Sequence, residues 1–241
     1  MPLRPEPQRP AKTLTDRPAF AGRFFVALLF LVLPFAAGAN PVLPSAQAET
    51  KTPLMSAARQ GDAAAVSRLI AAGDDVNASN AGGATARMFA ALSGDPLVTS
   101  LLVRAGARTD TKAKLGWTAL ALAAVKGYTE VGEVLLDAGA DQGVRDAYGW
   151  TPLMRAVDRR RADFVRLLLE SPGADIAVRQ EDGATALHIA AATGDLEIVR
   201  LLITHGADST VANRSGLTAA QIARSVGFAE IAAYLDGGAS N

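Results

Sequence analysis

The pattern of apolar and polar positions repeats itself along most of the chain. Each unit has an alanine- and leucine-rich stretch followed by a second apolar run at helical spacing, as from Val66 to Ile70 and from Val199 to Ile203. Each unit therefore predicts two short helices with one apolar face apiece. A threonine opens each unit, and successive threonines are 33, 33, 33, 34 and 33 residues apart: Thr52, Thr85, Thr118, Thr151, Thr185 and Thr218.

The residues between the apolar stretches predict where each helix begins and ends. A threonine hydroxyl accepts a hydrogen bond from a first-turn N–H, and a proline directly after it, as in Thr52-Pro53, suits the first helical position. A glycine nine residues later, as at Gly94, can end the first helix in the left-handed conformation, and a second glycine, as at Gly139, can end the second helix. One such pair cannot bury its apolar surface alone, so the units are expected to stack.

The units also share a sequence motif. It reads Thr52-Pro53-Leu54-Met55, Thr118-Ala119-Leu120-Ala121, Thr151-Pro152-Leu153-Met154 and Thr185-Ala186-Leu187-His188, with Gly-Ala-Asp closing several units, as at Gly206-Ala207-Asp208. Residues 52 to about 236 thereby resemble the ankyrin repeat. The resemblance implies an all-α solenoid of about six helix-turn-helix units with projecting β-turns. Within a domain of residues 49–241, the expected repeats are about 52–83, 84–116, 117–149, 150–183, 184–216 and 217–238.

Three residues depart from the repeat pattern. Pro172 is an extra residue, so we expect the second helix of the fourth repeat to end early and bulge. Arg87 stands where leucine is expected, and it either extends to solvent or shifts its helix. Arg160 replaces the mid-repeat glycine within Arg159-Arg160-Arg161, although an arginine is costly in a left-handed turn. Such misfits arise by drift or by design, and the arginine cluster merits a test.

The first 48 residues have the layout of a secretory signal peptide. A basic segment precedes the apolar run Phe24 to Ala37, and small residues follow it. This run has 14 residues and contains Pro34, whereas a membrane-spanning helix needs roughly 20 apolar residues. Cleavage is predicted before Glu49, with a second possible site before Asn40. The alternative is an uncleaved N-terminal anchor. Either way the rest of the chain is exported, so the expected location is periplasmic or secreted.

Composition narrows the classes of function. The chain has no cysteine, which excludes disulfides, thiol nucleophiles and thiolate zinc sites. Residues 49–241 hold 19 basic and 22 acidic residues, and this mildly acidic balance argues against a nucleic-acid partner. Membrane contact is expected only through the N-terminal segment, if that segment is uncleaved.

No catalytic, cofactor-binding or metal-binding set stands out. Neither a Gly-x-Ser-x-Gly nucleophile motif nor a phosphate-binding Gly-Lys-Ser/Thr occurs, and no metal-spaced carboxylates accompany either histidine. The family resemblance implies that His188 makes a structural hydrogen bond between neighbouring turns. His205 precedes Gly206 at the end of a second helix, where a donor or cation answers the exposed carbonyls. We therefore predict that the protein is not an enzyme and uses no cofactor.

In ankyrin arrays the β-turn tips and the concave side of the first helices carry the contacts, and the resemblance places the candidate protein-binding residues there. The candidates are Lys112, Lys114, Leu115, Trp117, Lys126, Arg145, Tyr148, Trp150, Asp158, Arg159, Arg179, Glu181 and Arg214.

Both tryptophans of the chain occupy the position just before the threonine, at Trp117 and Trp150. One interpretation makes them binding hot spots in an aromatic strip flanked by cations, which would suit an acidic protein surface. Replacing either by alanine would then weaken binding by roughly 2 kcal/mol or more. In the other interpretation each tryptophan packs on the adjacent turn, as aromatic residues at this place often do in the family.

The predicted function is therefore an exported scaffold or adaptor that binds a partner protein through its concave face and turn tips. Exported bacterial proteins of this type resemble accessory factors for periplasmic enzymes, including catalases, so such an enzyme is one possible partner. The alternative is an inhibitor, an immunity-type protein or a host-directed effector that blocks its target. An adaptor leaves its partner active, whereas an inhibitor silences it.

Overall fold

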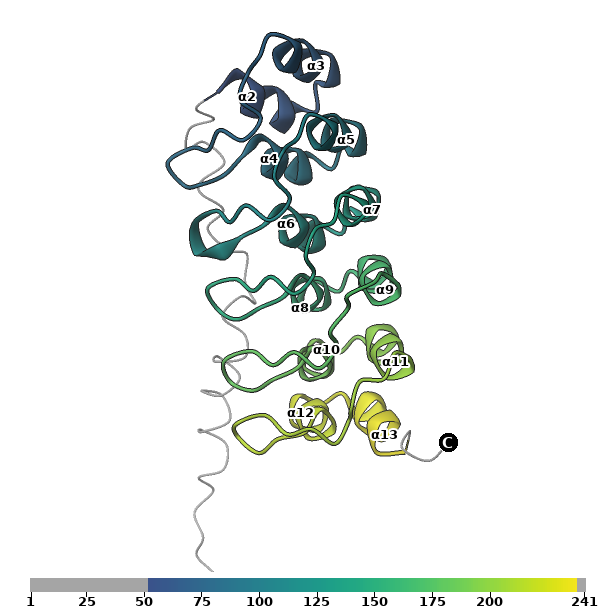
Figure 1. Cartoon of the computed structure of the whole chain (residues 1–241). Helices are drawn as coiled ribbons and strands as arrows, with labels where there is room; N and C mark the ends of the chain where they lie inside the picture. Colours follow the sequence, from purple (N-terminus) through teal and green to yellow (C-terminus); the bar gives the residue numbers. More distant parts are fainter. Residues whose placement is uncertain (1–51, 238–241) are drawn as a thin grey trace, which may run out of the picture. The chain divides into compact units, whose positions relative to one another are not determined.

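The computed structural model describes residues 52–237, and these form a single stack of helix pairs. Figure 1 shows the first helix of each pair in one row, the second helix in another row, and the connecting turns projecting to the same side. The predicted signal segment of residues 1–48 lies outside the described residues. Among residues 52–237, no helix is long and apolar enough to cross a membrane.

Twelve α-helices make up the described part of the chain, and they alternate between the two rows. The first helices are α2 (Pro53–Gln60), α4 (Ala86–Ser93), α6 (Ala119–Lys126), α8 (Pro152–Asp158), α10 (Ala186–Thr193) and α12 (Ala219–Val226). The second helices are α3 (Ala63–Ala71), α5 (Pro96–Arg104), α7 (Thr129–Asp137), α9 (Ala162–Glu170), α11 (Leu196–Thr204) and α13 (Ala229–Gly237). A 3-10 turn, η1 (Lys114–Gly116), lies in the turn tip before α6. Each tip is numbered with the first helix that follows it, so this is the tip of the third repeat, although the expected repeat boundary falls after it.

The threonines begin the first helices, as the sequence predicts. The Thr52 hydroxyl accepts from Met55 N at 3.1 Å, and Thr118 and Thr151 cap their helices in the same way two and three repeats later. At Thr185 the cap is shared with His188, whose ring accepts the Thr185 backbone N–H. Thr85 occupies the same position before α4 but makes no side-chain cap hydrogen bond. Where a cap forms, it satisfies a donor that the helix itself cannot, so helices of only seven or eight residues begin at a defined position.

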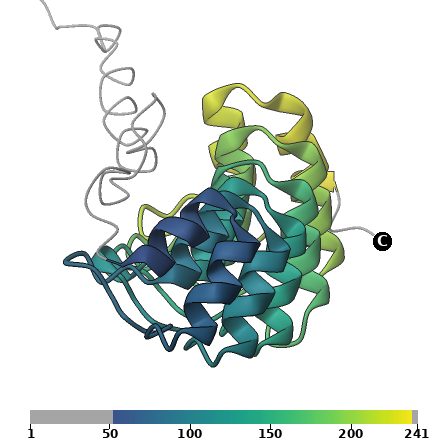
Figure 2. The same ribbon diagram turned by 90° about the horizontal axis from the view of Figure 1, so that it is seen from above.

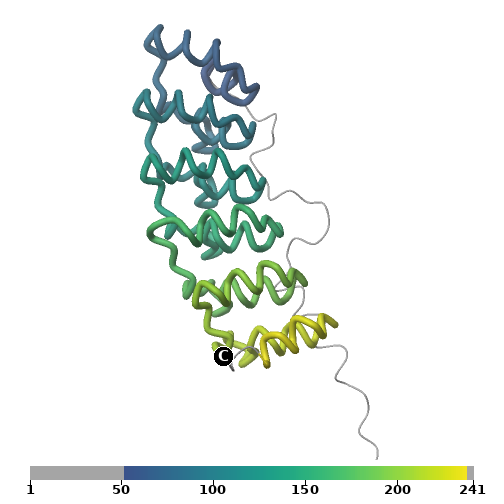
Figure 3. Tube along the Cα trace, turned by 90° about the vertical axis from the view of Figure 1, so that its right-hand side faces the viewer, coloured from purple at the N-terminus to yellow at the C-terminus, as the bar shows by residue number. Residues whose placement is uncertain are grey.

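The core is one continuous layer between the rows of helices. Successive repeats stack helix on helix (Figure 3) and fan out when seen from above (Figure 2). Leu120 and Leu187 of the first helices are buried, as are Val131 and Phe164 of the second helices. A side chain at Gly132 would collide with the Phe164 ring, so this glycine gives the large ring its space. Close packing of this kind stabilises the array without disulfides.

The mid-repeat glycines serve two purposes. Gly94 and Gly194 have φ of 79° and 75°, the left-handed conformation that ends α4 and α10. A Cβ on either would also lie within 3 Å of an aromatic ring from the next repeat, Tyr128 or Phe228. Glycine is therefore required there both for its backbone angle and for its small size.

Arg160 takes the left-handed conformation in place of glycine, with φ of 55°. The next repeat presents Asp195 at the position where Tyr128 and Phe228 stand, and Arg160 Nε lies 3.1 Å from Asp195 Oδ2. The short, oppositely charged neighbour accommodates the longer side chain. The expected costly conformation is confirmed, and an ion pair accompanies it.

Pro172 does not shorten its helix. α9 spans nine residues, as do the other second helices, so the expectation of an early end is wrong. The extra residue is absorbed after the helix, where Ser171 is extended and the carbonyl of Pro172 accepts from Gln142 Nε2 at 2.9 Å. A turn adapts to an insertion more easily than a packed helix, because its backbone is not tied to an i−4 ladder.

Arg87 does not extend to solvent. Its residue is 2% exposed inside α4, and Nη2 donates to the carbonyl of Ala107. Within the described residues, its Nε and Nη1 have no hydrogen-bond partner. Burial lowers the pKa of this guanidinium, and Asp110 acts in the opposite direction. The helix nevertheless keeps its eight residues and its place in the row.

Candidate protein-interaction face

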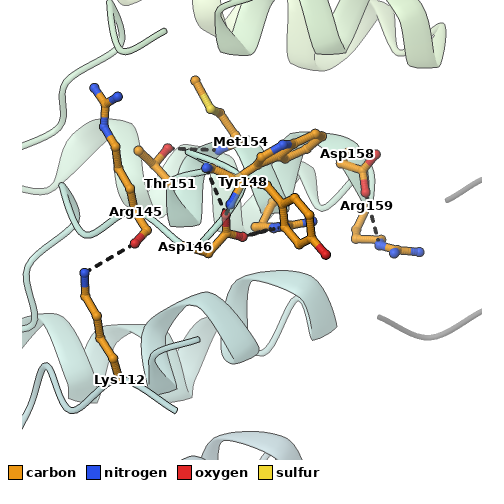
Figure 4. A network of polar contacts seen from close by, with 10 residues as sticks. Lys112, Arg145, Asp146, Tyr148, Thr151, Met154, Asp158 and Arg159 are labelled. Atoms are coloured by element: carbon orange, nitrogen blue, oxygen red, sulfur yellow. Dashed lines mark hydrogen bonds and ion pairs between the residues drawn. The ribbon is translucent and has the colours of Figure 1, made fainter. Parts of the chain in front are cut away.

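The turn tips are joined to one another by a ladder of cationic side chains. Lys112 Nζ donates to the carbonyl of Arg145 at 3.3 Å, Arg145 Nη1 to that of Arg179 at 3.1 Å, and Arg179 Nη2 to that of Ala212 at 2.6 Å. Figure 4 shows the first of these contacts. Each cation thus bonds the equivalent residue of the next repeat. The three side chains remain exposed, so they hold the tips together and also present positive charge.

Backbone hydrogen bonds reinforce the same edge. Ala147 N donates to the carbonyl of Leu115 at 2.9 Å, and Arg214 N donates to that of Asp182 at 2.8 Å. Because the tips are bonded through both backbone and side chains, they form a preorganised edge, which loses less conformational entropy on binding than free loops would.

The tip of the fourth repeat is built around Asp146, whose carboxylate is almost fully buried. Its Oδ1 accepts from the backbone N–H groups of Tyr148 and Trp150, at 2.9 and 3.1 Å. Its Oδ2 accepts from Arg155 Nε at 2.9 Å and from Nη2 of the same guanidinium. The guanidinium lies over two indole rings, 4.8 Å from the centroid of Trp117 and 4.5 Å from that of Trp150. This Trp-Arg-Trp stack joins the third and fourth tips.

The two tryptophans of the stack differ in exposure, and therefore in whether they can contact a partner. Trp117 is 3% exposed and packs on the guanidinium of the neighbouring repeat, so its placement as an exposed hot spot is wrong. Trp150 is half-buried and still offers part of its ring. For Trp117 the structure favours the interpretation of packing on the adjacent turn, because the ring is enclosed by Arg155 and the turn of its own repeat.

Sequence reasoning missed Arg155, the residue at the centre of the stack. A signal was available, because its equivalents in the other repeats are apolar or small: Ser56, Phe89, Leu122, Ile189 and Ile222. A charged residue at a buried position implies an opposite charge nearby. The pairing with Asp146, nine residues earlier, becomes apparent only once the turn folds back.

Two apolar side chains stand out from the tips. Tyr148 is 55% exposed and Leu115 is 40% exposed. Leu115 also has φ of 63°, a conformation that costs a non-glycine residue about 1–2 kcal/mol. A bulky apolar side chain held in a strained position and exposed to solvent suggests a contact with something outside the fold.

Three candidates lie on the first helices, and all are half-buried: Lys126, Asp158 and Arg159. Asp158 Oδ2 is 3.2 Å from Arg159 Nε. Figure 4 draws this ion pair. Burial raises the pKa of the Asp158 carboxyl, while the charges of Arg159 and Arg155 act in the opposite direction. The remaining candidates, Lys114, Glu181 and Arg214, are exposed at the tips.

The arginine cluster does not form one patch. Arg159 pairs with Asp158, Arg160 pairs with Asp195 of the next repeat, and Arg161 Nε donates to the carbonyl of Val125 in the preceding repeat at 3.3 Å. The three side chains extend in different directions and connect three repeats. Their contacts are therefore structural.

The two histidines are also accounted for within the fold. His188 Nδ1 accepts from Thr185 N at 3.1 Å, which leaves the proton on Nε2, 3.2 Å from the carbonyl of Leu217 in the next turn. The predicted bond between neighbouring turns is confirmed. His205 Nδ1 lies 2.8 Å from the carbonyl of Leu201 at the end of α11. Residues 52–237 contain no cluster of acidic and histidine side chains that could hold a metal ion.

Charge is segregated between the two sides of the stack. We call the turns and first helices the turn side, and the rest the second-helix side. The turn side holds 11 basic and 4 acidic residues, within 52–60, 79–93, 112–126, 145–159, 179–193 and 212–226. The second-helix side holds 7 basic and 17 acidic residues, within 61–78, 94–111, 127–144, 160–178, 194–211 and 227–237. The small net charge of the domain thus conceals a basic side and an acidic side.

A family model described as ankyrin repeats in three copies matches residues 25–113, 87–180 and 173–240. The chain belongs to the ankyrin-repeat family. Solved ankyrin-repeat structures agree with it: the protein EF0377 is 28% identical with a TM-score of 0.71, over 76% of this chain and 96% of its own. Among curated proteins, none matches this chain.

A second solved structure is similar over the same region. It is a complex of the Bd0816 predatory endopeptidase from Bdellovibrio bacteriovorus with the immunity protein Bd3460. One of its chains is 30% identical to this chain with a TM-score of 0.69, over 78% of this chain and 99% of its own. Ankyrin arrays are typically protein-interaction modules.

Proposed function

We propose that this ankyrin-repeat protein is an exported scaffold that binds a partner protein through its turn side. The observation that carries the proposal is the preorganised edge of the third and fourth repeats, where Leu115 and Tyr148 stand exposed among cations. Interface hot spots favour aromatic and arginine side chains, since these bury a large area with few frozen torsions. The proposed role is binding rather than catalysis.

Export is the second part of the proposal, and it rests on the sequence of residues 1–48 alone. Fractionation of cells that express the full chain, with N-terminal sequencing of the recovered protein, tests it. A mature start at Glu49 or Asn40 supports cleavage, whereas a start upstream of Phe24 in a membrane fraction supports the anchor. Recovery in the cytoplasm would overturn export without touching the binding role.

Site-specific crosslinking tests the binding role. A photo-crosslinking amino acid at Tyr148 should capture the partner in living cells, because that side chain projects from the tips. The same residue at Glu133 is the matched control, since Glu133 is exposed on the second-helix side. Equal capture at both positions, or no capture at Tyr148, contradicts the proposed face.

A specific similarity favours a second candidate function. The endopeptidase complex holds a chain that is 30% identical to this one, so this protein could be an immunity-type inhibitor of a peptidase. Purifying the captured partner and measuring its activity with and without the ankyrin domain separates the two roles. Retained activity supports the adaptor, and a stoichiometric loss of activity supports the inhibitor.

A further inference from the structure

The segregation of charge specifies which kind of protein surface the turn side can accept. The turn side has a net charge of +7 and the second-helix side has a net charge of −10. Of the turn side's four acids, Asp146 is paired with Arg155 and Asp158 with Arg159, which leaves Glu181 and Asp182. The exposed cations of the tips therefore act on solvent almost unopposed.

The exposed tip cations are also spread along the whole edge. They come from the third to the sixth repeats: Lys112, Lys114, Arg145, Arg179 and Arg214. Glu181 is the exposed carboxylate among them. Since the ladder of hydrogen bonds holds successive tips together, the positive charge forms a row rather than a single point.

We propose that the partner presents an acidic protein surface, which docks along this row of cations with Tyr148 and Leu115 as its apolar anchors. This inference rests on the proposed binding role. The acidic second-helix side repels the same surface, so docking is confined to one side of the stack. Association is fast at low salt and weakens as salt screens the charges.

Poly-L-glutamate is the probe for the acidic surface, with poly-L-lysine as the opposite charge. The wild-type domain should bind poly-L-glutamate at low ionic strength and lose affinity as salt rises. The variant K112E/K114E/R214E should bind about tenfold more weakly or worse, because three exposed cations become anions. Circular dichroism and the thermal midpoint check that the variant remains folded.

The control carries the same change of net charge on the other side. R68E/R104E/R108E alters three exposed arginines of the second-helix side. It should bind poly-L-glutamate within about twofold of wild type, because contact charges matter more than distant ones at moderate salt. If both triple variants lose affinity equally, the effect comes from net charge and the proposal fails. It fails as well if the wild type does not bind the probe.

Three further measurements test what else could bind the row of tip cations and whether the partner is acidic. Tighter binding to duplex DNA or to anionic vesicles than to poly-L-glutamate overturns a protein partner for this row. Salt-dependent self-association that the tip variant abolishes identifies a second copy, docked through its acidic side, and also overturns the proposal. If crosslinking at Tyr148 still captures the partner in the K112E/K114E/R214E background, the binding role stands and the acidic class of partner is wrong.

Discussion

Arg87 and Arg155 are both buried in first helices, two repeats apart, but their surroundings differ. The guanidinium of Arg155 donates to the carboxylate of Asp146 and lies over two indole rings. Arg87 has one carbonyl, from Ala107, and two nitrogen atoms without a partner in the described residues. A buried charge is costly unless it is paired and hydrogen-bonded. We therefore expect arginine to stabilise the fourth tip and to destabilise the second repeat.

The two arginines also differ in their relation to the exposed turn tips. Arg155 arranges the tip that presents Tyr148, through the carboxylate of Asp146. Arg87 donates to the carbonyl of Ala107 instead, and no feature of the described structure explains why arginine rather than leucine stands there. Whether a buried charge stabilises or destabilises the fold therefore depends on its bonding partners rather than on its burial alone.

The largest expected effect comes from removing Arg155. Arg155→Leu should lower the free energy of unfolding by about 3–5 kcal/mol, because it leaves the Asp146 carboxylate buried without a counter-charge. Urea denaturation measures the loss. Asp146→Asn in the same background should recover part of it, since the amide is neutral and still accepts from the tip N–H groups. A loss below about 1 kcal/mol for Arg155→Leu would show that the stack contributes little.

The opposite sign is expected at Arg87. Arg87→Leu should raise the free energy of unfolding by about 1–3 kcal/mol, because it removes unsatisfied buried donors and restores the repeat's usual apolar residue. Arg104→Leu on the exposed end of α5 is the control and should change stability by no more than about 0.5 kcal/mol. A destabilised Arg87→Leu protein would mean that the guanidinium is better satisfied than its contacts indicate.

His188 extends the comparison to a third buried polar side chain, one that is bonded at both ring nitrogens. Its effect on stability should depend on pH. Burial lowers its pKa below the ordinary value of 6.5, so the unfolded chain takes up the proton first. The contribution of neutral His188 to the free energy of unfolding is complete above about pH 6.5. It falls by up to about 1.4 kcal/mol per pH unit as the pH drops toward the pKa of His188 in the folded protein. Urea midpoints measured across this range should fall less steeply for His188→Asn than for wild type; parallel profiles would falsify the assignment.

The smallest effects concern the two non-glycine residues in the left-handed conformation. Leu115→Asn should raise the free energy of unfolding by about 0.5–1 kcal/mol, because asparagine tolerates this backbone better. Arg160→Asn should raise the free energy of unfolding by less, because this variant also loses the ion pair with Asp195. Thermal and urea midpoints compare the two variants. An equal or greater gain at Arg160 would mean that its ion pair offsets nothing.

The fold could be predicted from the sequence because its signals are local. A threonine such as Thr118 and a glycine such as Gly94 define the ends of a helix within a few residues, and the threonine occurs in all six repeats and the glycine in five. The expectation that Pro172 shortens its helix was wrong, because the sequence does not show whether the helix or the following turn changes its backbone to accommodate an extra residue.

The candidate site was harder to predict, because exposure depends on neighbours that are distant in sequence. Trp117 and Trp150 occupy the same repeat position and both lie against the Arg155 guanidinium, yet one is buried and the other half-buried. The tip cations could be identified from the motif, but their hydrogen bonds to the next repeat could not.

The sequence by itself determined the number and order of the helix pairs, the residues that cap them and the side chains carried by each turn. Only the tertiary structure decided which buried charges find partners, which tryptophan is enclosed and how charge divides between the two sides. The physical reason is range: caps and helices depend on contacts within one turn of chain, whereas burial and charge pairing depend on residues that stacking brings together from different repeats.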